Sequence, residues 1–310
     1  MSVLRRFGRL ALSLFVLVSA AFAMLHLVPG DPVRAALGDD APAALVEARR
    51  HELWLDRPLW EQYTHYLHRL ITGDLGTSMV SGLPVGDVIG ARFPATATLA
   101  ALSLAVVLLV SVPTGMAMAA LTRGERHRAA ELTFTGVTGA LSLIPEFLLA
   151  VGLVAVMSVG LGWLPVAGMS GPASYLLPVL ALACGPAAAL SRIVRVESLK
   201  VFGQDYIRTA RSKRLPRRLI YLRHALPNLL TAALTIGGLL AGGLIAGTVL
   251  VETVFAWPGL GSTIVQSIQG KDYPLVQGIV LVYGGIVLVV NLGVDLLLGV
   301  LDPRSMIRES

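Results

Sequence analysis

The chain has 310 residues, of which 55% are hydrophobic and only 14% are charged, and its formal net charge is +6. Soluble domains average about 25% charged residues, so this composition excludes an ordinary soluble protein and favours a membrane protein. The basic residues gather in short segments between long apolar runs, a distribution that argues against a nucleic-acid partner. The single cysteine, Cys184, lies in an apolar run, so an intramolecular disulfide is excluded.

Three uncharged runs are long enough to cross a bilayer, which takes about 20 apolar residues in a helix. They contain 30 residues at 93–122, 45 residues at 147–191 and 26 residues at 226–251. The longest run must contain a turn, which the Gly and Pro residues of 160–172 supply. We therefore predict an all-α membrane protein with six transmembrane helices, near residues 10–28, 96–121, 132–157, 175–192, 228–251 and 275–300.

The first apolar run has two interpretations. Arg5, Arg6 and Arg9 precede it, and Ala21-Phe22-Ala23 resembles the cleavage site of a signal peptide. The apolar run continues to Val28, however, and this length favours a first helix that is retained.

The positions of Lys and Arg predict the orientation in the membrane. With the N-terminus inside, the inner segments hold 18 of the 25 basic residues, and the outer segments hold seven. Six of those seven lie in the 29–94 loop, which is long enough to be translocated regardless of charge. Both termini are therefore expected in the cytoplasm, an N-in/C-in topology.

The outer loop between the first two helices is expected to be structured. Asp56 and Pro58 are typical of a helix start, and Gly73 is typical of a helix end. The helix between them would carry an apolar face and a polar face with Glu61, His65 and His68 at i, i+4 and i+7. Such a triplet can bind a metal, but a solvated polar face is the favoured interpretation, so no metal site is predicted.

The chain lacks the motifs of common catalytic sites. None of its three lysines precedes Ser or Thr, so it has no Walker A loop, and we predict no catalytic residue and no cofactor in this chain. The segment Gly168-Met169-Ser170-Gly171 resembles the nucleophile motif of rhomboid proteases. The only later histidine, His224, falls in an inner loop, so Ser170 is interpreted as a turn residue.

Two acids in the predicted spans are candidate pathway or gate residues, because ionisable groups within a membrane are costly and often functional. Glu146 follows Pro145 near the middle of the third span, where it can line a substrate path or serve as a structural acid. Glu252 is expected at the outer end of the fifth span, where it can be merely interfacial. The small residues at 238–247 of this span permit close helix packing.

The sixth span adds two further candidate pathway or gate residues. Asn291 and Asp295 are four positions apart and therefore share a helix face. Asp295 is expected level with Arg192 and Arg195 of the fourth span, so a structural ion pair is the favoured interpretation.

The segment DYIRTARSKRL at 205–215 lies in the most basic inner loop. Tyr206, Ala210 and Lys213 recur at helical spacing, which predicts a short surface helix between two membrane segments. Such a helix can transmit force between a soluble motor and a transmembrane bundle.

Ordered motifs cover nearly the whole chain. They are LVPGDPV (27–33), LDRPL (55–59), GDLGTS (73–78), RFPAT (92–96), IPEF (144–147), WLP (163–165), VETVF (251–255), WPGLG (257–261), DYP (272–274), VQG (276–278), Asn291, Asp295 and LDPR (301–304). The ordered set resembles the permease subunits of ABC importers of the dipeptide/oligopeptide/nickel family, on the B-type side. Each motif is weak alone, but the series is specific.

The resemblance implies a type I ABC importer permease fold in the bacterial inner membrane. It also implies half of a translocation pathway for short peptides, divided into a first helix (1–28), an extracytoplasmic loop domain (29–94) and a five-helix core (95–310) with a coupling loop at 193–226. The implied partners are a homologous second permease, two cytoplasmic ATPase subunits that hold ATP and Mg, an extracytoplasmic substrate-binding protein and membrane lipid.

The alternative function is a self-sufficient secondary transporter or channel. It would need inverted repeats or a proton relay, and neither is visible in the sequence. The cargo stays open among dipeptide, oligopeptide, nickel chelate, glutathione and haem.

The resemblance also assigns the basic loop to coupling with the ATPases. The implied coupling residues are Asp205, Tyr206, Ile207, Arg208, Thr209, Ala210, Arg211, Arg214, Leu226 and Pro227. Tyr206, Ile207 and Ala210 are expected to present one face to a groove in an ATPase subunit, with Arg208 and Arg211 beside it.

Two residues depart from the family's coupling motif. His224 replaces its Ile, and Arg214 replaces its usual Gly. A non-Gly residue resists positive φ, so we expect either a helix one turn longer or a bend at another residue.

Overall fold

The computed structural model describes residues 3–27, 31–38, 40–125 and 127–301. Within these ranges the regular structure is helical, apart from one isolated bridge between Thr77 and Pro84. This confirms the predicted all-α class. The helices form two compact units, which are taken in turn: residues 97–257 with 289–310, and residues 2–96 with 258–288. The contacts thus group the first helix and the outer loop with 258–288, and the predicted boundaries at 28 and 94 stay predictions.

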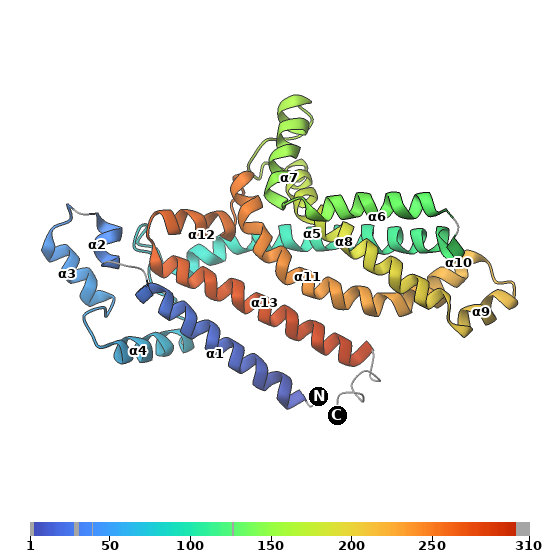
Figure 1. Cartoon of the computed structure of the whole chain (residues 1–310). Helices are drawn as coiled ribbons and strands as arrows, with labels where there is room; N and C mark the ends of the chain where they lie inside the picture. The colour runs from blue at the N-terminus through green and yellow to red at the C-terminus, as the bar shows by residue number, and fades with distance from the viewer. Residues whose placement is uncertain (1–2, 28–30, 39, 126, 302–310) are drawn as a thin grey trace. The chain divides into compact units, whose positions relative to one another are not determined.

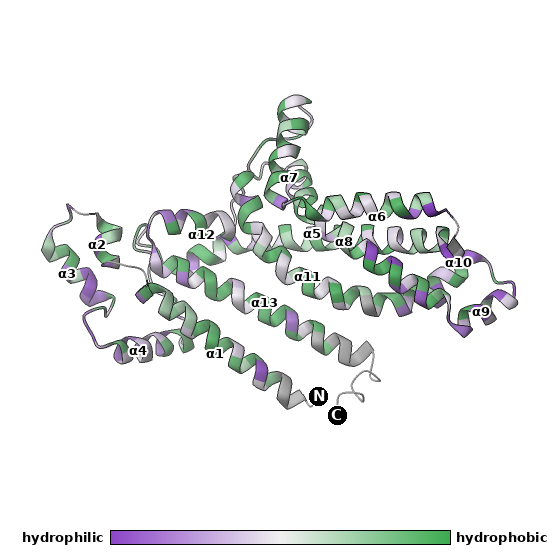
Figure 2. Cartoon of the chain, viewed as in Figure 1, coloured by the Kyte–Doolittle hydropathy of each residue, from purple (hydrophilic) through white to green (hydrophobic). Residues whose placement is uncertain are grey.

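Five helices in the described ranges are long and apolar enough to cross a membrane (Figures 1 and 2). They are α1 (Val3–Leu27), α5 (Val85–Leu121), α8 (Leu176–Phe202), α11 (Leu226–Val254) and α13 (Tyr273–Leu301). They match five of the six predicted spans.

The remaining predicted span, the third in the chain, near 132–157, is not one straight helix. It is a pair, α6 (Arg128–Leu143) and α7 (Glu146–Leu153), with π-helical residues Val154–Gly160 continuing α7, and the two parts meet at 95°. The break follows from Pro145, which lacks an N–H and keeps the preceding residue out of the helical region. Ile144 accordingly has an extended ψ of 121°. The predicted span is therefore present as a bent pair, which accounts for the sixth predicted crossing if the pair forms one span.

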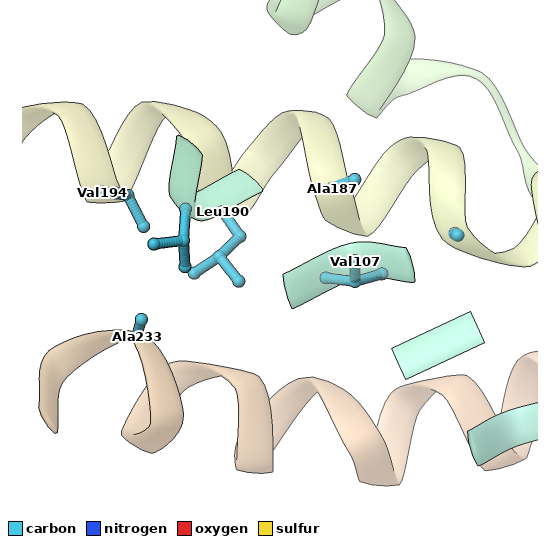
Figure 3. Close-up of a cluster of buried hydrophobic side chains, with 7 residues drawn as sticks. Val107, Ala187, Leu190, Val194 and Ala233 are labelled. Carbon is cyan, nitrogen blue, oxygen red and sulfur yellow. The ribbon is translucent and has the colours of Figure 1, made fainter. Parts of the chain in front are cut away.

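The core of the first unit lies where α5, α8 and α11 meet. Val107 of α5, Leu190 and Val194 of α8 and Ala233 of α11 form one buried cluster (Figure 3). Small residues let the helices approach, and a Cβ on Gly238 of α11 would collide with Val294 of α13. The predicted close packing holds at Gly238 and at Gly247, whose Cβ would crowd Leu182, whereas a Cβ on Gly243 would meet nothing within 4 Å.

The second unit contains the structured outer loop that was expected. Its helices are α2 (Pro32–Leu37), α3 (Ala43–Glu52) and α4 (Leu59–Ile71), and α12 (Leu260–Gln269) belongs to the same unit. Gly73, with φ of 80°, follows α4 as predicted. Asp56 does not cap α4, because Pro58 occupies the N-cap, and the Asp56 carboxylate lies 3.9 Å from the His51 ring instead.

The polar face of α4 gives no sign of metal binding. Among the described residues, no group of three His, Cys, Asp or Glu side chains is arranged to hold a metal ion. His65 instead stacks on the Trp54 ring at 4.0 Å.

Hydrogen bonds between distant motifs hold the second unit together. The Asp272 carboxylate accepts hydrogen bonds from the Ser78 hydroxyl and from the Met79 N–H, the latter at 3.0 Å. Likewise, the Thr96 hydroxyl accepts a 2.8 Å bond from the N–H of Leu260. These bonds join segments about 160 to 190 positions apart in the chain. Several motifs found in the sequence are therefore structural contacts.

Candidate functional site

The basic inner loop folds as a short helix, α9 (Asp205–Ser212), that follows α8 directly. Ile207 and Ala210 are 0% and 5% exposed, and they pack in a cluster with residues of α5, α8 and α11. The cluster consists of Ala119, Phe202, Ile207, Ala210, Ile220, Ala225 and Leu229. The apolar edge of α9 is thus buried against the membrane helices of its own chain.

This burial corrects the predicted contact face. Ile207 and Ala210 cannot meet a groove in another subunit, because their own chain covers them. Tyr206 is 42% exposed and stays available. Helical periodicity identified the apolar edge correctly but could not say which neighbour covers it.

The exposed edge of α9 is polar, with two arginines and one acid among five residues. It comprises Asp205, Tyr206, Arg208, Thr209 and Arg211. Arg208 lies 3.6 Å from the Asp205 carboxylate, and both side chains are largely exposed, so this ion pair contributes little stability. Tyr206, Arg208 and Arg211 therefore project from a helix that is fixed on its other side.

Arg214 makes the turn that ends α9. Its φ is 54°, in the left-handed region, and the helix stops at Ser212. The N–H of Leu215 donates to the Ala210 carbonyl at 3.3 Å, and that of Arg214 donates to the Arg211 carbonyl at 2.9 Å. This is the Schellman pattern, in which glycine is usual at the left-handed position.

Both expectations for this turn were therefore wrong. The helix is not longer, and no other residue replaces the bend. The hydrogen bonds and the packing of Leu215 against the α9 cluster hold Arg214 in a conformation that costs roughly 1–2 kcal/mol for a non-Gly residue.

A groove beside α9 adds basic surface. It has a volume of about 760 Å³ and is lined by Arg123 and His127 of the α5–α6 connection, by Arg211 of α9 and by Arg217 of the segment that follows α9, among others. Leu226 and Pro227 lie just beyond, in the first turn of α11, where the missing N–H of proline costs no helical hydrogen bond. The groove offers positive charge to an acidic surface that approaches α9.

Glu146 lies at the start of α7, directly after the bend, which is near the middle of the third span when α6 and α7 together form one span. Its carboxylate is half-buried against α11, and a Cβ on Gly247 would stand 2.8 Å from Oε1. The glycine thus leaves room for the carboxylate between two helices. The helix N-terminus also favours a negative charge at this point.

Glu252 is fully buried, so it is not an exposed acid at the end of the span, and its role as a pathway or gate residue stays a prediction. Its backbone carbonyl accepts a 2.8 Å hydrogen bond from the N–H of Trp257, which closes the turn after α11. Phe255 and Trp257 are buried beside it, and the Trp257 ring meets the Tyr175 ring edge-on at 4.7 Å. A residue's position at the end of a span indicates how deep it lies in the membrane, but not which other elements cover its side chain.

The arginines of α8 have partners on α5 and α6. Arg195 forms a 2.7 Å ion pair with Glu131 and donates to the Thr122 hydroxyl, while Arg192 donates to the Ser142 hydroxyl at 3.0 Å.

The predicted partner of these arginines, Asp295, lies on α13. Its side chain is outside the described part of the structure, so the pairing stays a prediction. Asn291 is half-buried on the same helix.

Two family models match the chain in succession. Residues 1–100 match the N-terminal part of the membrane components of binding-protein-dependent transport systems. Residues 111–307 match the model described as "Binding-protein-dependent transport system inner membrane component".

Curated relatives match over almost their full length. The glutathione transport system permease protein GsiC of Pectobacterium atrosepticum is 38% identical over 293 residues, which is 94% of each chain. The protein of the same name from Escherichia coli K12 is 37% identical over 302 residues, which is 97% of each chain.

A solved structure shows the same fold at low identity. It is titled as inward facing conformations of the MetNI methionine ABC transporter, and the match has a TM-score of 0.55 at 16% identity. It covers 69% of this chain and 96% of the other. Since one family model alone covers more than half of the sequence, the chain belongs to the inner membrane components of binding-protein-dependent transport systems, the permeases of ABC importers.

Proposed function

We propose that this inner-membrane permease carries short peptides and forms half of a pathway that a homologous second permease completes. The cargo proposal rests on the relatives named as glutathione permeases, which match over 94–97% of the chain. Glutathione is a tripeptide with a cationic ammonium and two carboxylates, so it shares its end groups with short peptides.

The force that drives transport enters through α9, from a cytoplasmic ATPase that holds ATP and Mg. The observation that supports this proposal is the two-sided character of α9. Ile207 and Ala210 fix it to the cluster that joins α5, α8 and α11, while Tyr206, Arg208 and Arg211 stay exposed. A displacement of α9 must therefore move the packed membrane helices with it, since tightly packed interiors transmit strain.

The basic surface suits an acidic rim on the ATPase. Arg208 and Arg211 project from α9, and the neighbouring groove adds Arg123 and Arg217. Complementary charges of this kind steer association and fix register between subunits.

Glu146 is the candidate contact for the substrate's ammonium group. Its carboxylate is half-buried between α7 and α11, where Gly247 leaves space for it. A carboxylate away from bulk water forms a stronger hydrogen bond with a cation than an exposed one does. Glu252, Asn291 and Asp295 stay candidate gate residues without an assigned contact.

Site-specific photo-crosslinking tests the coupling proposal. A photoreactive amino acid at Thr209, on the exposed edge of α9, should capture the ATPase subunit in membranes that contain the whole importer. The same group at Ser81, in the exposed outer loop, is the matched control and should capture no ATPase. If neither Thr209 nor Tyr206 yields a crosslink to the ATPase, α9 does not contact the ATPase and the coupling proposal is wrong.

A further inference from the structure

The outer-loop helix α4 lies against the outer end of the first membrane helix, α1 (Figure 1). The Tyr63 hydroxyl is 2.7 Å from the Ser19 hydroxyl, and the His26 ring is 2.9 Å from the Gln62 amide oxygen. Between these contacts, the Phe22 ring meets the Tyr63 ring edge-on at 5.1 Å. One face of α4 is therefore fixed to α1.

These contacts set the depth of α4. The described part of the apolar stretch of α1 reaches Leu27, five residues after Phe22. At 1.5 Å per residue, Phe22 is about 8 Å inside the apolar stretch. Helices that lie in the membrane surface bury their apolar faces about 5–10 Å deep.

A second face of α4 is polar and is covered by its own loop. His65 stacks on Trp54, and Arg69 pairs with the Asp74 carboxylate at 2.8 Å. The Arg69 hydrogen bond holds the pKa of Asp74 below its ordinary value, so the pair is charged at neutral pH. This face belongs on the water side.

The third face of α4 is apolar and uncovered. Trp60 is 67% exposed and Ile71 is 86% exposed, and at 100° per residue the two side chains point in nearly the same direction. This face is adjacent to the one that contacts α1. It therefore continues the apolar surface of α1, on which Phe15 and Val16 are each 57% exposed.

The chain belongs to an inner-membrane family, and α1 is a candidate membrane span, so its exposed apolar surface lies at the depth of the acyl chains. We propose that α4 is an interfacial helix that anchors the outer loop in the outer leaflet, with Trp60 and Ile71 among the acyl chains and His65 and Arg69 toward water. Tryptophan suits this position because its ring is apolar and its N–H reaches the polar headgroups. The partner of this face is thus lipid.

Spin labels on the reconstituted importer test the proposal. Single cysteines replace Trp60 or Ile71 after Cys184 and the cysteines of the other subunits are removed. Labels at both positions should collide readily with oxygen, which concentrates in lipid, and poorly with a water-soluble nickel chelate. Val16→Cys, on the exposed face of the candidate span α1, is the control within the membrane, and His68→Cys, on the exposed polar side of α4, is the water-facing control.

The proposal predicts oxygen-to-nickel collision ratios at Trp60→Cys and Ile71→Cys that approach the Val16→Cys value and exceed the His68→Cys value several-fold. Ratios equal to the His68→Cys ratio would place this face in water and overturn the proposal. Low collision rates with both reagents would show a protein cover. If those rates fall only after the substrate-binding protein is added, the face is its docking site instead of a lipid anchor.

Discussion

The inner helix α9 and the outer helix α4 are both short polar elements beside membrane helices, but they are attached by different means. α9 is held by buried apolar side chains, Ile207 and Ala210, with no hydrogen bond from its polar edge to the bundle among the described contacts. α4 is held by polar and aromatic contacts, such as Ser19 with Tyr63. Apolar packing leaves the polar edge of α9 free for a second protein, whereas specific hydrogen bonds fix the outer loop in place.

The buried side of α9 gives the largest expected effect. Ala210→Asp would bury a charge without a partner, which typically costs about 3–5 kcal/mol. We expect loss of the folded permease from the membrane, measured by its abundance and by the thermal stability of the detergent-purified chain. Thr209→Asp, one position away on the exposed edge, should fold normally. Normal folding of Ala210→Asp would contradict the inward orientation of this edge.

The outer unit should be sensitive to the loss of one carboxylate. Asp272→Asn weakens two hydrogen bonds, to Ser78 and to Met79, and bonds to charged groups contribute about 1.5–3 kcal/mol each. We expect faster proteolysis of the outer loop in intact importer. Asp87→Asn, at an exposed acid in the first turn of α5, is the control and should lower stability by only about 0.3–1 kcal/mol. If the Asp272→Asn and Asp87→Asn variants resist protease equally, Asp272 does not stabilise the outer loop.

Glu146→Gln separates a pathway role from a structural one. If the carboxylate meets the ammonium group of a peptide, its loss should cost about 1.5–3 kcal/mol, roughly ten- to a hundredfold in site affinity. Uptake kinetics should then change while assembly with the ATPase does not. Gly247→Ala, which crowds the same carboxylate, should reduce uptake in the same way. Wild-type uptake by the Gln variant would assign Glu146 to structure.

The smallest effect is expected at the end of α9. Arg214→Gly relieves a left-handed conformation, and we expect a gain of about 1 kcal/mol in stability, seen as a higher Tm. Lys213→Gly, at a neighbouring position with φ of −74°, should lower the Tm instead. A lower Tm for Arg214→Gly would mean that the guanidinium makes a contact worth more than the strain.

Most of the fold could be predicted, because the lengths of the apolar runs and the positions of the charged residues between them determine the transmembrane spans. The positions of α1, α5, α8, α11 and α13 followed from uncharged runs, and α9 followed from its helical spacing. Pro145 marks a place where a helix can break, but Pro186 lies inside α8 without ending it, so a proline alone did not predict the 95° bend.

The rest of the site depended on tertiary contacts that a sequence does not display. The position of Glu252 at the end of a span is visible in the sequence, but its complete burial depends on tertiary packing. Arg214 adopts a conformation against its own preference because the bond from Leu215 and the packed cluster determine the turn. The direction of Ile207 and Ala210 likewise depends on α5, α8 and α11, which are remote in sequence.

The central claim is that the exposed basic edge of α9 receives the force of ATP hydrolysis. The most direct test is the combined variant Arg208→Glu and Arg211→Glu, assayed in proteoliposomes for substrate-stimulated ATP hydrolysis and for uptake. Both side chains are exposed, so the permease should fold and insert as before. Arg128→Glu, an exposed charge reversal in the first turn of α6, outside α9, is the matched control, because a helix N-terminus favours a negative charge. We predict loss of uptake and of substrate-stimulated hydrolysis in the double variant alone, and wild-type values for both activities would contradict the account.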